Sequence, residues 1–250
     1  MSSNYVIHPI PLFVCHIPKT FMTYLTNFWE TLRIGQYVWY IEGPRENILV
    51  DAGFTLERAA ARPNLIKKTE PIQTLEEGLK KFGLECSDID TVIITHTDHD
   101  HISLLHEFHK AKKIIQRAEL DFVHNPHPVF QAWRPPDFMS LIEGIDFEEV
   151  EGDTKIDEGI ELILTPGHTP GGQSVAVKTG LGTAIITGWC CIQENIYPSP
   201  EVVKKGLSAI PTSVHTDLLQ SYESIEKVKN MADIVLPVHE VELINRTSIP

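Results

Sequence analysis

The chain has 250 residues, of which 42% are hydrophobic and 22% charged, as in an ordinary globular protein with a sizeable core. A formal net charge of −13 argues against nucleic acid and anionic membrane surfaces as partners, but it does not oppose a metal cation. No apolar run approaches the roughly 20 residues of a membrane span, and we identify no signal peptide. The four cysteines lack the spacing of a secreted disulfide framework. We therefore expect one domain over residues 1–250, located in the cytoplasm.

Short β-rich segments alternate with helical patterns along the chain. Residues 36–43 and 47–53 are two such segments separated by a short turn, and they predict a β-hairpin. Thr74 and Glu77 form a capping box at the start of a helix, and Gly83 supplies its C-terminal stop. This order predicts an α/β fold with strands in two groups and helices between them. Further strands are predicted over 91–95, 112–116, 160–164, 173–179, 183–187 and 233–238, and further helices over 102–110 and 215–231.

An irregular segment interrupts this alternation over residues 121–145. It contains four prolines and several aromatic residues, and it shows no clear helical or strand period. Long irregular segments in compact domains are often lids or pocket walls. A surface excursion that packs on its own aromatic residues is the alternative, and both interpretations stay open.

The stretch TVIITHTDHDHISLL (91–105) concentrates three histidines and two aspartates at the end of a predicted buried strand. Histidine and aspartate are common metal ligands, and strand ends hold side chains rigidly enough for coordination. A polar residue follows each of five predicted strands, so these five residues can meet at one edge of a sheet sandwich. These residues are Asp51, His96, His168, Cys190 and His239.

Four motifs resemble those of the metallo-β-lactamase superfamily. HTDHDH (96–101) is similar to its His-x-His-x-Asp-His signature, and LTPGHTPGGQSV (164–175) is similar to its third histidine motif. VLPVHEVEL (235–243) resembles the last motif, and ILVDAG (48–53) resembles the strand whose aspartate supports the metal site. Segments 36–54 and 110–123 are most similar to the N-acyl homoserine lactonase branch.

The resemblance implies an αββα sandwich of two mixed β-sheets flanked by helices, with one or two zinc ions at one edge. It also implies that Asp100 is a ligand that takes part in proton transfer. The metal ligands that we expect are His96, Asp98, Asp100, His101, His168, His239 and Cys190.

The sequence departs from the family pattern at two places. Asp98 stands where the signature has its second histidine, and TGWCCIQEN (187–195) lacks the aspartate that bridges two metals in dinuclear members. A carboxylate in place of an imidazole suits iron or manganese better, whereas a thiolate from Cys190 or Cys191 favours zinc. We therefore expect zinc, with iron and manganese as alternatives.

Each candidate also has a purely structural interpretation. The histidines and Asp100 could form a hydrogen-bonded polar cluster, and His239 could be a buried core histidine. Asp98 could orient a histidine instead of binding metal. Cys190 could be a small buried apolar residue. The convergence of the strand ends favours the metal site for the motif histidines.

The leading functional hypothesis is a metal-dependent hydrolase that opens a lactone or similar ester of a small molecule, by hydroxide generated on the metal. Aromatic residues could hold an apolar acyl or ring part of this substrate. An iron-dependent oxidoreductase and a degenerate, non-catalytic metal-binding protein are the two alternatives. The sequence leaves the oligomeric state open, a homodimer included. The aromatic candidates are Phe21, Phe28, Trp29, Phe130, Trp133 and Phe138.

Overall fold

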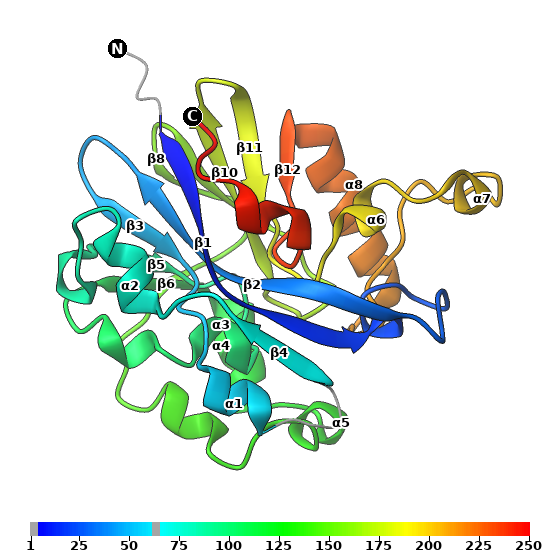
Figure 1. Ribbon diagram of the computed structural model, residues 1–250, viewed down its shortest axis with the longest axis horizontal. Coiled ribbons are helices and arrows are strands. Elements are labelled where there is room, and N and C mark those ends of the chain that lie inside the picture. Colours follow the sequence, from blue (N-terminus) through cyan, green and yellow to red (C-terminus); the bar gives the residue numbers. More distant parts are fainter. Residues whose placement is uncertain (1–4, 62–65) are drawn as a thin grey trace.

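The computed structural model describes residues 5–61 and 66–250. In this part of the chain two mixed β-sheets pack face to face, and helices cover both outer faces (Figure 1). The expected αββα sandwich is confirmed. The first sheet contains, in spatial order, β4 (Lys68–Pro71), β1 (Val6–Pro18), β2 (Thr31–Glu42), β3 (Asn47–Val50), β5 (Thr91–Ile93), β6 (Lys112–Gln116) and β7 (Glu148–Val150). The second contains β12 (Ile234–Leu236), β11 (Gly182–Ile186), β10 (Gln173–Thr179), β9 (Ile160–Leu164) and β8 (Thr154–Asp157).

The helices lie on two sides of the sandwich. Helices α1 to α5 lie on the side of the first sheet, and α6 and α8 lie beside the second (Figure 1). No helix among the described residues combines the length and apolar character that a membrane crossing requires. The helices are α1 (Leu56–Ala60), α2 (Leu75–Lys80), α3 (His99–Ile102), α4 (Arg117–His124), α5 (Pro128–Gln131), α6 (Gln193–Ile196), α7 (Pro200–Val203) and α8 (Leu218–Met231). Short 3-10 turns cover Lys19–Phe21, Cys86–Asp88, Leu105–Glu107, Phe138–Leu141 and Val241–Asn245.

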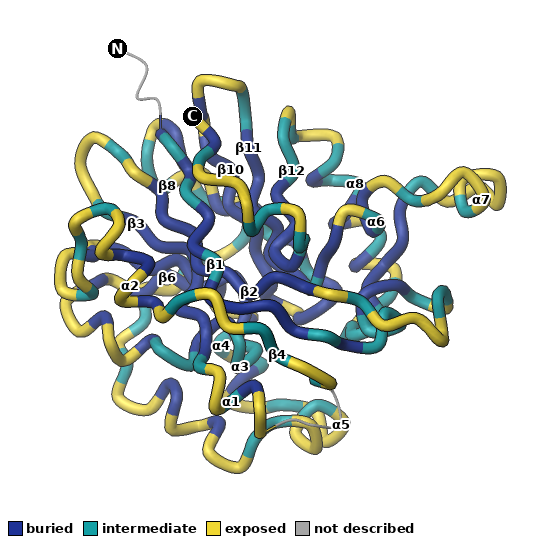
Figure 2. Tube along the Cα trace, in the orientation of Figure 1, coloured by how far each residue is buried: buried dark blue, intermediate teal, exposed yellow. Residues whose placement is uncertain are grey.

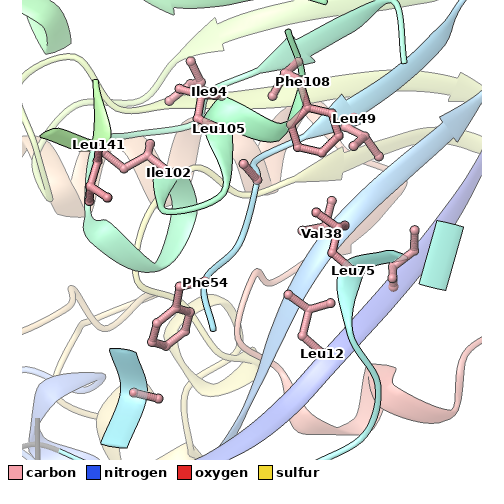
Figure 3. Packing of buried hydrophobic residues seen from close by; sticks show 14 of the residues in the cluster. Leu12, Val38, Leu49, Phe54, Leu75, Ile94, Ile102, Leu105, Phe108 and Leu141 are labelled. Atoms are coloured by element: carbon pink, nitrogen blue, oxygen red, sulfur yellow. The ribbon is translucent and has the colours of Figure 1, made fainter. Parts of the chain in front are cut away.

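Alternation of side chains along each strand divides the core into layers. In β2, Val38 packs under the helices of the first sheet, whereas the next residue, Trp39, packs between the two sheets. In β9, Leu162 lies between the sheets and Ile163 faces α8. The buried residues therefore lie at the centre of the molecule (Figure 2). Figure 3 shows part of the buried layer between the first sheet and its helices.

Most of the predicted elements are present, and several have the predicted bounds. The hairpin of β2 and β3 is antiparallel, and the capping box of Thr74 and Glu77 begins α2. Gly83 has a φ of +74°, a left-handed conformation that ends the helix at little cost for glycine. Strands β6, β9 and β10 cover the predicted residues. Segment 102–110, predicted as one helix, instead contains the end of α3 and a separate 3-10 turn.

Strand β1 has no counterpart in the sequence predictions. Pro9, Pro11 and Pro18 argue against a strand because proline cannot donate to a ladder. The structure accommodates Pro9 and Pro11 because β1 pairs with β4 only over Phe13–His16, which leaves one edge of β1 unpaired by β4 at these prolines. A register shift also separates Pro11 from Phe13.

Candidate metal centre

The polar strand ends converge at one edge of the sandwich. Strands β3 and β5 are parallel in the first sheet, and β11 and β12 are parallel in the second, so their carboxyl ends lie at the same edge. Two hydrogen bonds join the sheets there: Gln173 N donates to Thr95 O at 2.9 Å, and Gln173 Nε2 donates to Ile94 O at 2.8 Å. The loops after β5 and β9 are therefore fixed to each other.

A first triad consists of His96, Asp98 and His168, whose ligand atoms all lie within 4.8 Å of one another. Asp98 Oδ2 lies 3.8 Å from His96 Nε2 and 3.2 Å from His168 Nε2. The two imidazoles are buried, whereas the Asp98 side chain is 49% exposed. The triad therefore has a buried base and an open side.

A second triad consists of Asp100, His101 and His239 and meets the same distance limit. Asp100 Oδ2 lies 3.6 Å from His101 Nε2 and 3.8 Å from His239 Nε2. The His96 and His101 rings are 4.0 Å apart between centroids, so the two triads are neighbours. The structure thus brings together six of the seven predicted ligands, in two groups of three.

The histidines of the β5 loop are oriented through their Nδ1 atoms. His101 Nδ1 donates to Asp51 Oδ2 at 2.7 Å. Thr95 Oγ1 donates to the same carboxylate at 2.9 Å, so it accepts from His96 Nδ1, 3.0 Å away. Each Nε2 therefore faces its triad and is the nitrogen that could bind a metal ion.

The other two histidines are oriented by backbone carbonyls, which only accept. His168 Nδ1 donates to Val214 O at 2.6 Å, and His239 Nδ1 donates to Gly35 O at 3.1 Å. All four imidazoles of the triads therefore bond to the protein through Nδ1 and direct Nε2 toward the carboxylates, an arrangement that imidazole ligands of metals adopt.

The donor set fits a divalent metal ion. His101 Nε2 and His168 Nε2 are buried and have no hydrogen-bond partner, even though the Asp98 carboxylate lies near His168. A buried nitrogen without a partner is costly, and a metal ion would satisfy both. Two imidazoles and one carboxylate in each triad are donors that zinc, iron and manganese accept.

Asp51 connects the strand ends beneath both triads. It is fully buried, has a φ of +63° and accepts from Thr95 N at 2.8 Å in addition to His101 and Thr95 Oγ1. Ala52 N donates to His101 O at 2.7 Å. The end of β3 thereby fixes the position of the β5 loop that carries four of the triad residues.

Burial and neighbouring charges set the protonation of the triads. Burial and the neighbouring His101 and His168 hold the pKa of His96 well below its usual value, and burial also lowers the pKa of His239 to about 4. Burial opposes ionisation of Asp98, but the neighbouring His168 outweighs it and holds the pKa of Asp98 well below its usual value. His96 and His239 are therefore neutral and Asp98 is ionised at neutral pH. Burial also opposes protonation of His101, but Asp51 and Asp100 outweigh it and raise the pKa of His101 to about 9, so a metal ion would displace a proton from His101.

Glu119 on α4 is a supporting residue that the sequence did not indicate. Its buried carboxylate accepts from Thr97 N at 2.8 Å, from Thr97 Oγ1 at 2.7 Å and from Gly171 N at 3.2 Å. Burial raises the pKa of Glu119 above its usual value. Glu119 therefore joins the loop of the HTDHDH motif to the loop that carries His168.

We expect Gly171→Ala to destabilise this junction by about 1–3 kcal/mol, the usual cost of overpacking. A Cβ at position 171 would lie 2.0 Å from Glu119 N, and this contact is with backbone that cannot move aside alone. Denaturant unfolding measures the loss. Gly172→Ala is the milder comparison and is expected to cost less, because a Cβ there would lie 3.1 Å from Thr165 O, a contact that a shift of a few tenths of an ångström relieves. Equal stability of the two variants would contradict the proposed role of the close approach.

Cys190 lies outside both triads. Its Sγ is 3.6 Å from Met22 Sδ, and burial together with Asp100 and Asp98 raises the pKa of this thiol well above its usual value. Its neighbours Trp189 and Cys191 point into the core beside α8. No carboxylate therefore replaces the missing bridging aspartate at this strand end.

We expect Cys190→Ser to change the bound metal content by less than about one quarter, because six nitrogen and oxygen ligands remain. Elemental analysis of the purified variant measures this. Loss of one ion per chain in the variant, together with thiolate charge-transfer absorption of cobalt in the wild-type protein, would instead identify Cys190 as a ligand.

A cavity of about 510 Å³ opens over the two triads. The predicted pocket wall at 121–145, which contains the end of α4 and all of α5, forms one side of this cavity. His99 and His215 also line the cavity, whereas Phe28 and Trp29 line an adjoining groove that shares Phe21. Triad residues that line the cavity are Asp98, Asp100, His168 and His239, and the aromatic ones are Phe21, Phe54, Phe122, Phe130, Trp133 and Phe138.

Comparisons with known proteins agree with this site. The profile of the metallo-beta-lactamase superfamily matches residues 33–230. An N-acyl homoserine lactonase of Bacillus sp is 28% identical over 160 residues, which are 60% of this chain and 61% of that protein. The alignment thus spans less than two thirds of the relative.

Solved structures with the same fold cover nearly the whole chain. An N-acyl homoserine lactone hydrolase with the product N-hexanoyl-L-homoserine at its catalytic metal centre has a TM-score of 0.74 and 23% identity, covering 98% of this chain and 96% of that one. AidC, a dizinc quorum-quenching lactonase, has a TM-score of 0.68 and 17% identity, covering 96% and 91%. With its two triads at the edge of an αββα sandwich, the chain belongs to the metallo-β-lactamase superfamily.

Proposed function

We propose that the protein is a metal-dependent hydrolase that opens the lactone ring, or a similar ester, of a small molecule with an apolar acyl or ring part. The observation that carries the proposal is the convergence of four Nε2 atoms and two carboxylates at the base of one cavity. The similarity to N-acyl homoserine lactonases supports a lactone as the substrate.

The first and second triads would each hold one divalent ion, with zinc as the expected metal and iron or manganese as alternatives. A bound ion lowers the pKa of water from about 15.7 toward about 7 and polarises an acyl carbonyl. The triad residues would hold the ions, and their orientation is fixed by the protein: Asp51 and Thr95 orient two imidazoles, and backbone carbonyls orient the other two.

Asp100 is the proposed catalytic residue. Its Oδ2 faces the imidazoles of the second triad, its side chain is 17% exposed, and it lines the cavity. Coulombic interaction with His101 and His99 outweighs burial and lowers the pKa of Asp100, so the carboxylate is ionised at neutral pH. We propose that it accepts a proton at the start of hydrolysis and returns one to the leaving alcohol.

The cavity wall would bind the apolar part of the substrate. Phe130 and Phe138 belong to the segment after α4, and Phe21 and Met22 face the same cavity from the loop after β1. Aromatic and aliphatic side chains bind an acyl chain by removing apolar surface from water. The reacting carbonyl would thus lie at the metal ions, and the remainder of the substrate would lie against the apolar wall.

We further propose that residues 1–250 act as one hydrolase domain in the cytoplasm, on a small-molecule substrate rather than on nucleic acid or a membrane. The net charge of −13 supports this choice of substrate. All four cysteines are free, which is consistent with a reducing compartment. A homodimer stays a prediction that light scattering checks.

The test is metal-dependent turnover on a panel of N-acyl homoserine lactone, aryl ester and thioester substrates. We expect lactone opening that a chelator abolishes and that stoichiometric zinc, iron or manganese restores. Full activity after chelation, with elemental analysis showing no metal, would contradict the proposal. Metal binding without any turnover favours the degenerate binding protein, and an iron-only protein that consumes oxygen favours the oxidoreductase.

A further inference from the structure

The two triads have the same donor set. Each contains two imidazole Nε2 atoms and one carboxylate, and each carries a single formal negative charge when its histidines are neutral. Asp98 creates this match, because an imidazole at position 98 would give the first triad three nitrogen donors and no charge. Both positive charges of a divalent ion would then be uncompensated in the first triad, whereas Asp100 would neutralise one of them in the second.

The triads also share no ligand. Among the described residues, the groups able to hold a metal are these two sets of three, and no histidine, cysteine or acidic residue belongs to both. Asp98 lies nearest the imidazoles of its own triad, and Asp100 lies nearest those of the second. The strand end at Trp189 contributes an indole that points into the core. Each carboxylate therefore serves one position.

We infer that the two triads form separate metal positions with matched donors, and that Asp98 reduces the preference of the first position for zinc over manganese and iron. The inference rests on the proposed metal-dependent function and names the residue that sets metal selectivity. It concerns the affinity of the site and holds whichever ester is the substrate.

The chemistry of the donors gives the direction of the effect. Divalent affinity at nitrogen, oxygen and sulfur sites generally rises from manganese to zinc, so the protein still binds zinc more tightly in absolute terms. A carboxylate is a harder donor than imidazole and suits manganese and iron relatively better. Replacing Asp98 by an imidazole therefore increases the difference in affinity between zinc and the other two metals at the first position and leaves the second position unchanged.

The experiment compares the wild-type protein with Asp98→His and with the mirror variant Asp100→His. Metal-free protein is titrated under anaerobic conditions with zinc, manganese and ferrous iron in turn, in competition with a chromophoric chelator. The wild-type protein is expected to bind two ions, one in each triad. Asp98→His is expected to raise the zinc-to-manganese affinity ratio roughly tenfold at one position and leave the other unchanged.

Asp98→Asn keeps the shape and one oxygen donor, so it reports the role of charge even if the histidine variant fails to fold. It is expected to weaken all three metals at one position by at least about tenfold. The inference is overturned by a wild-type protein that binds a single ion, or by an Asp98→His variant that binds two ions with the wild-type zinc-to-manganese affinity ratio at both positions. Two bound ions without ester hydrolysis would overturn the proposed function and leave this inference standing.

Discussion

A double variant, His96→Ala with His101→Ala, is expected to lose both metal ions and to slow ester hydrolysis by about 10³-fold. Each substitution leaves one imidazole and one carboxylate in its triad, which is too few protein ligands for tight binding. Loss of the several kcal/mol that a metal contributes to the transition state corresponds to this factor. Elemental analysis and steady-state kinetics on the same preparation measure the two effects.

The matched control for this double variant is His106→Ala with His109→Ala. Both of these histidines are exposed and lie outside the triads, only a few residues farther along the chain. The control is expected to keep two ions and activity within about twofold of the wild-type protein, as surface substitutions usually do. A double-triad variant that keeps its metal content would contradict the assignment of the ligands.

Asp51→Asn is expected to weaken metal binding by about 10- to 100-fold, although Asp51 is not itself a triad residue. The carboxylate accepts three hydrogen bonds, through Oδ1 from Thr95 N and through Oδ2 from Thr95 Oγ1 and His101 Nδ1. An amide has one oxygen, so it places an NH₂ group against one set of these donors. The His101 imidazole then loses its orientation. Competition titration with zinc measures the change.

The same substitution is expected to lower the free energy of unfolding by about 3 kcal/mol, because it disrupts a buried charged network. Asp146→Asn is the matched control, since Asp146 is exposed and lies outside both triads. It is expected to leave both quantities unchanged. Wild-type metal affinity in Asp51→Asn would show that the imidazoles do not depend on Asp51 for their orientation.

The part of the fold that depends on local pattern could be predicted from the sequence. Strands such as 112–116 and 160–164 are short apolar runs bounded by turns, and Thr74 with Glu77 specifies a helix start through two reciprocal hydrogen bonds. Strand β1 could not be predicted in this way. Its prolines are tolerated because of where β4 stops pairing with it, and that is a property of the whole sheet.

The site shows the same division between local and long-range information. The candidate ligands could be predicted because a cluster of histidine and aspartate after an apolar strand has a chemical meaning in itself. Which residues form each triad could not be predicted, because it depends on rotamers and on the approach of two sheets. Glu119 gave no signal because a glutamate on a short helix is usually exposed, whereas here Thr97 and the closely approaching Gly171 both contact it and it is buried.

The orientation at the end of β11 is a second case. Residues 189–191 read Trp-Cys-Cys, and the sequence does not reveal which of these side chains faces the site. In the structure Cys190 lines the cavity, while Trp189 and Cys191 pack against the helical layer. Trp189 and Cys191 lie on the same side as Ile185, so the arrangement continues the alternation of β11 beyond the last residue of that strand, which the sequence alone does not mark.

Anomalous scattering from crystals of the protein, recorded at the zinc, iron and manganese edges, reports whether the two triads hold metal ions. Two peaks are expected, one in each triad, with each ion about 2.0–2.2 Å from Nε2 atoms and from the Asp98 or Asp100 carboxylate. Crystals grown with added zinc, iron or manganese that show no peak at either triad would contradict this expectation.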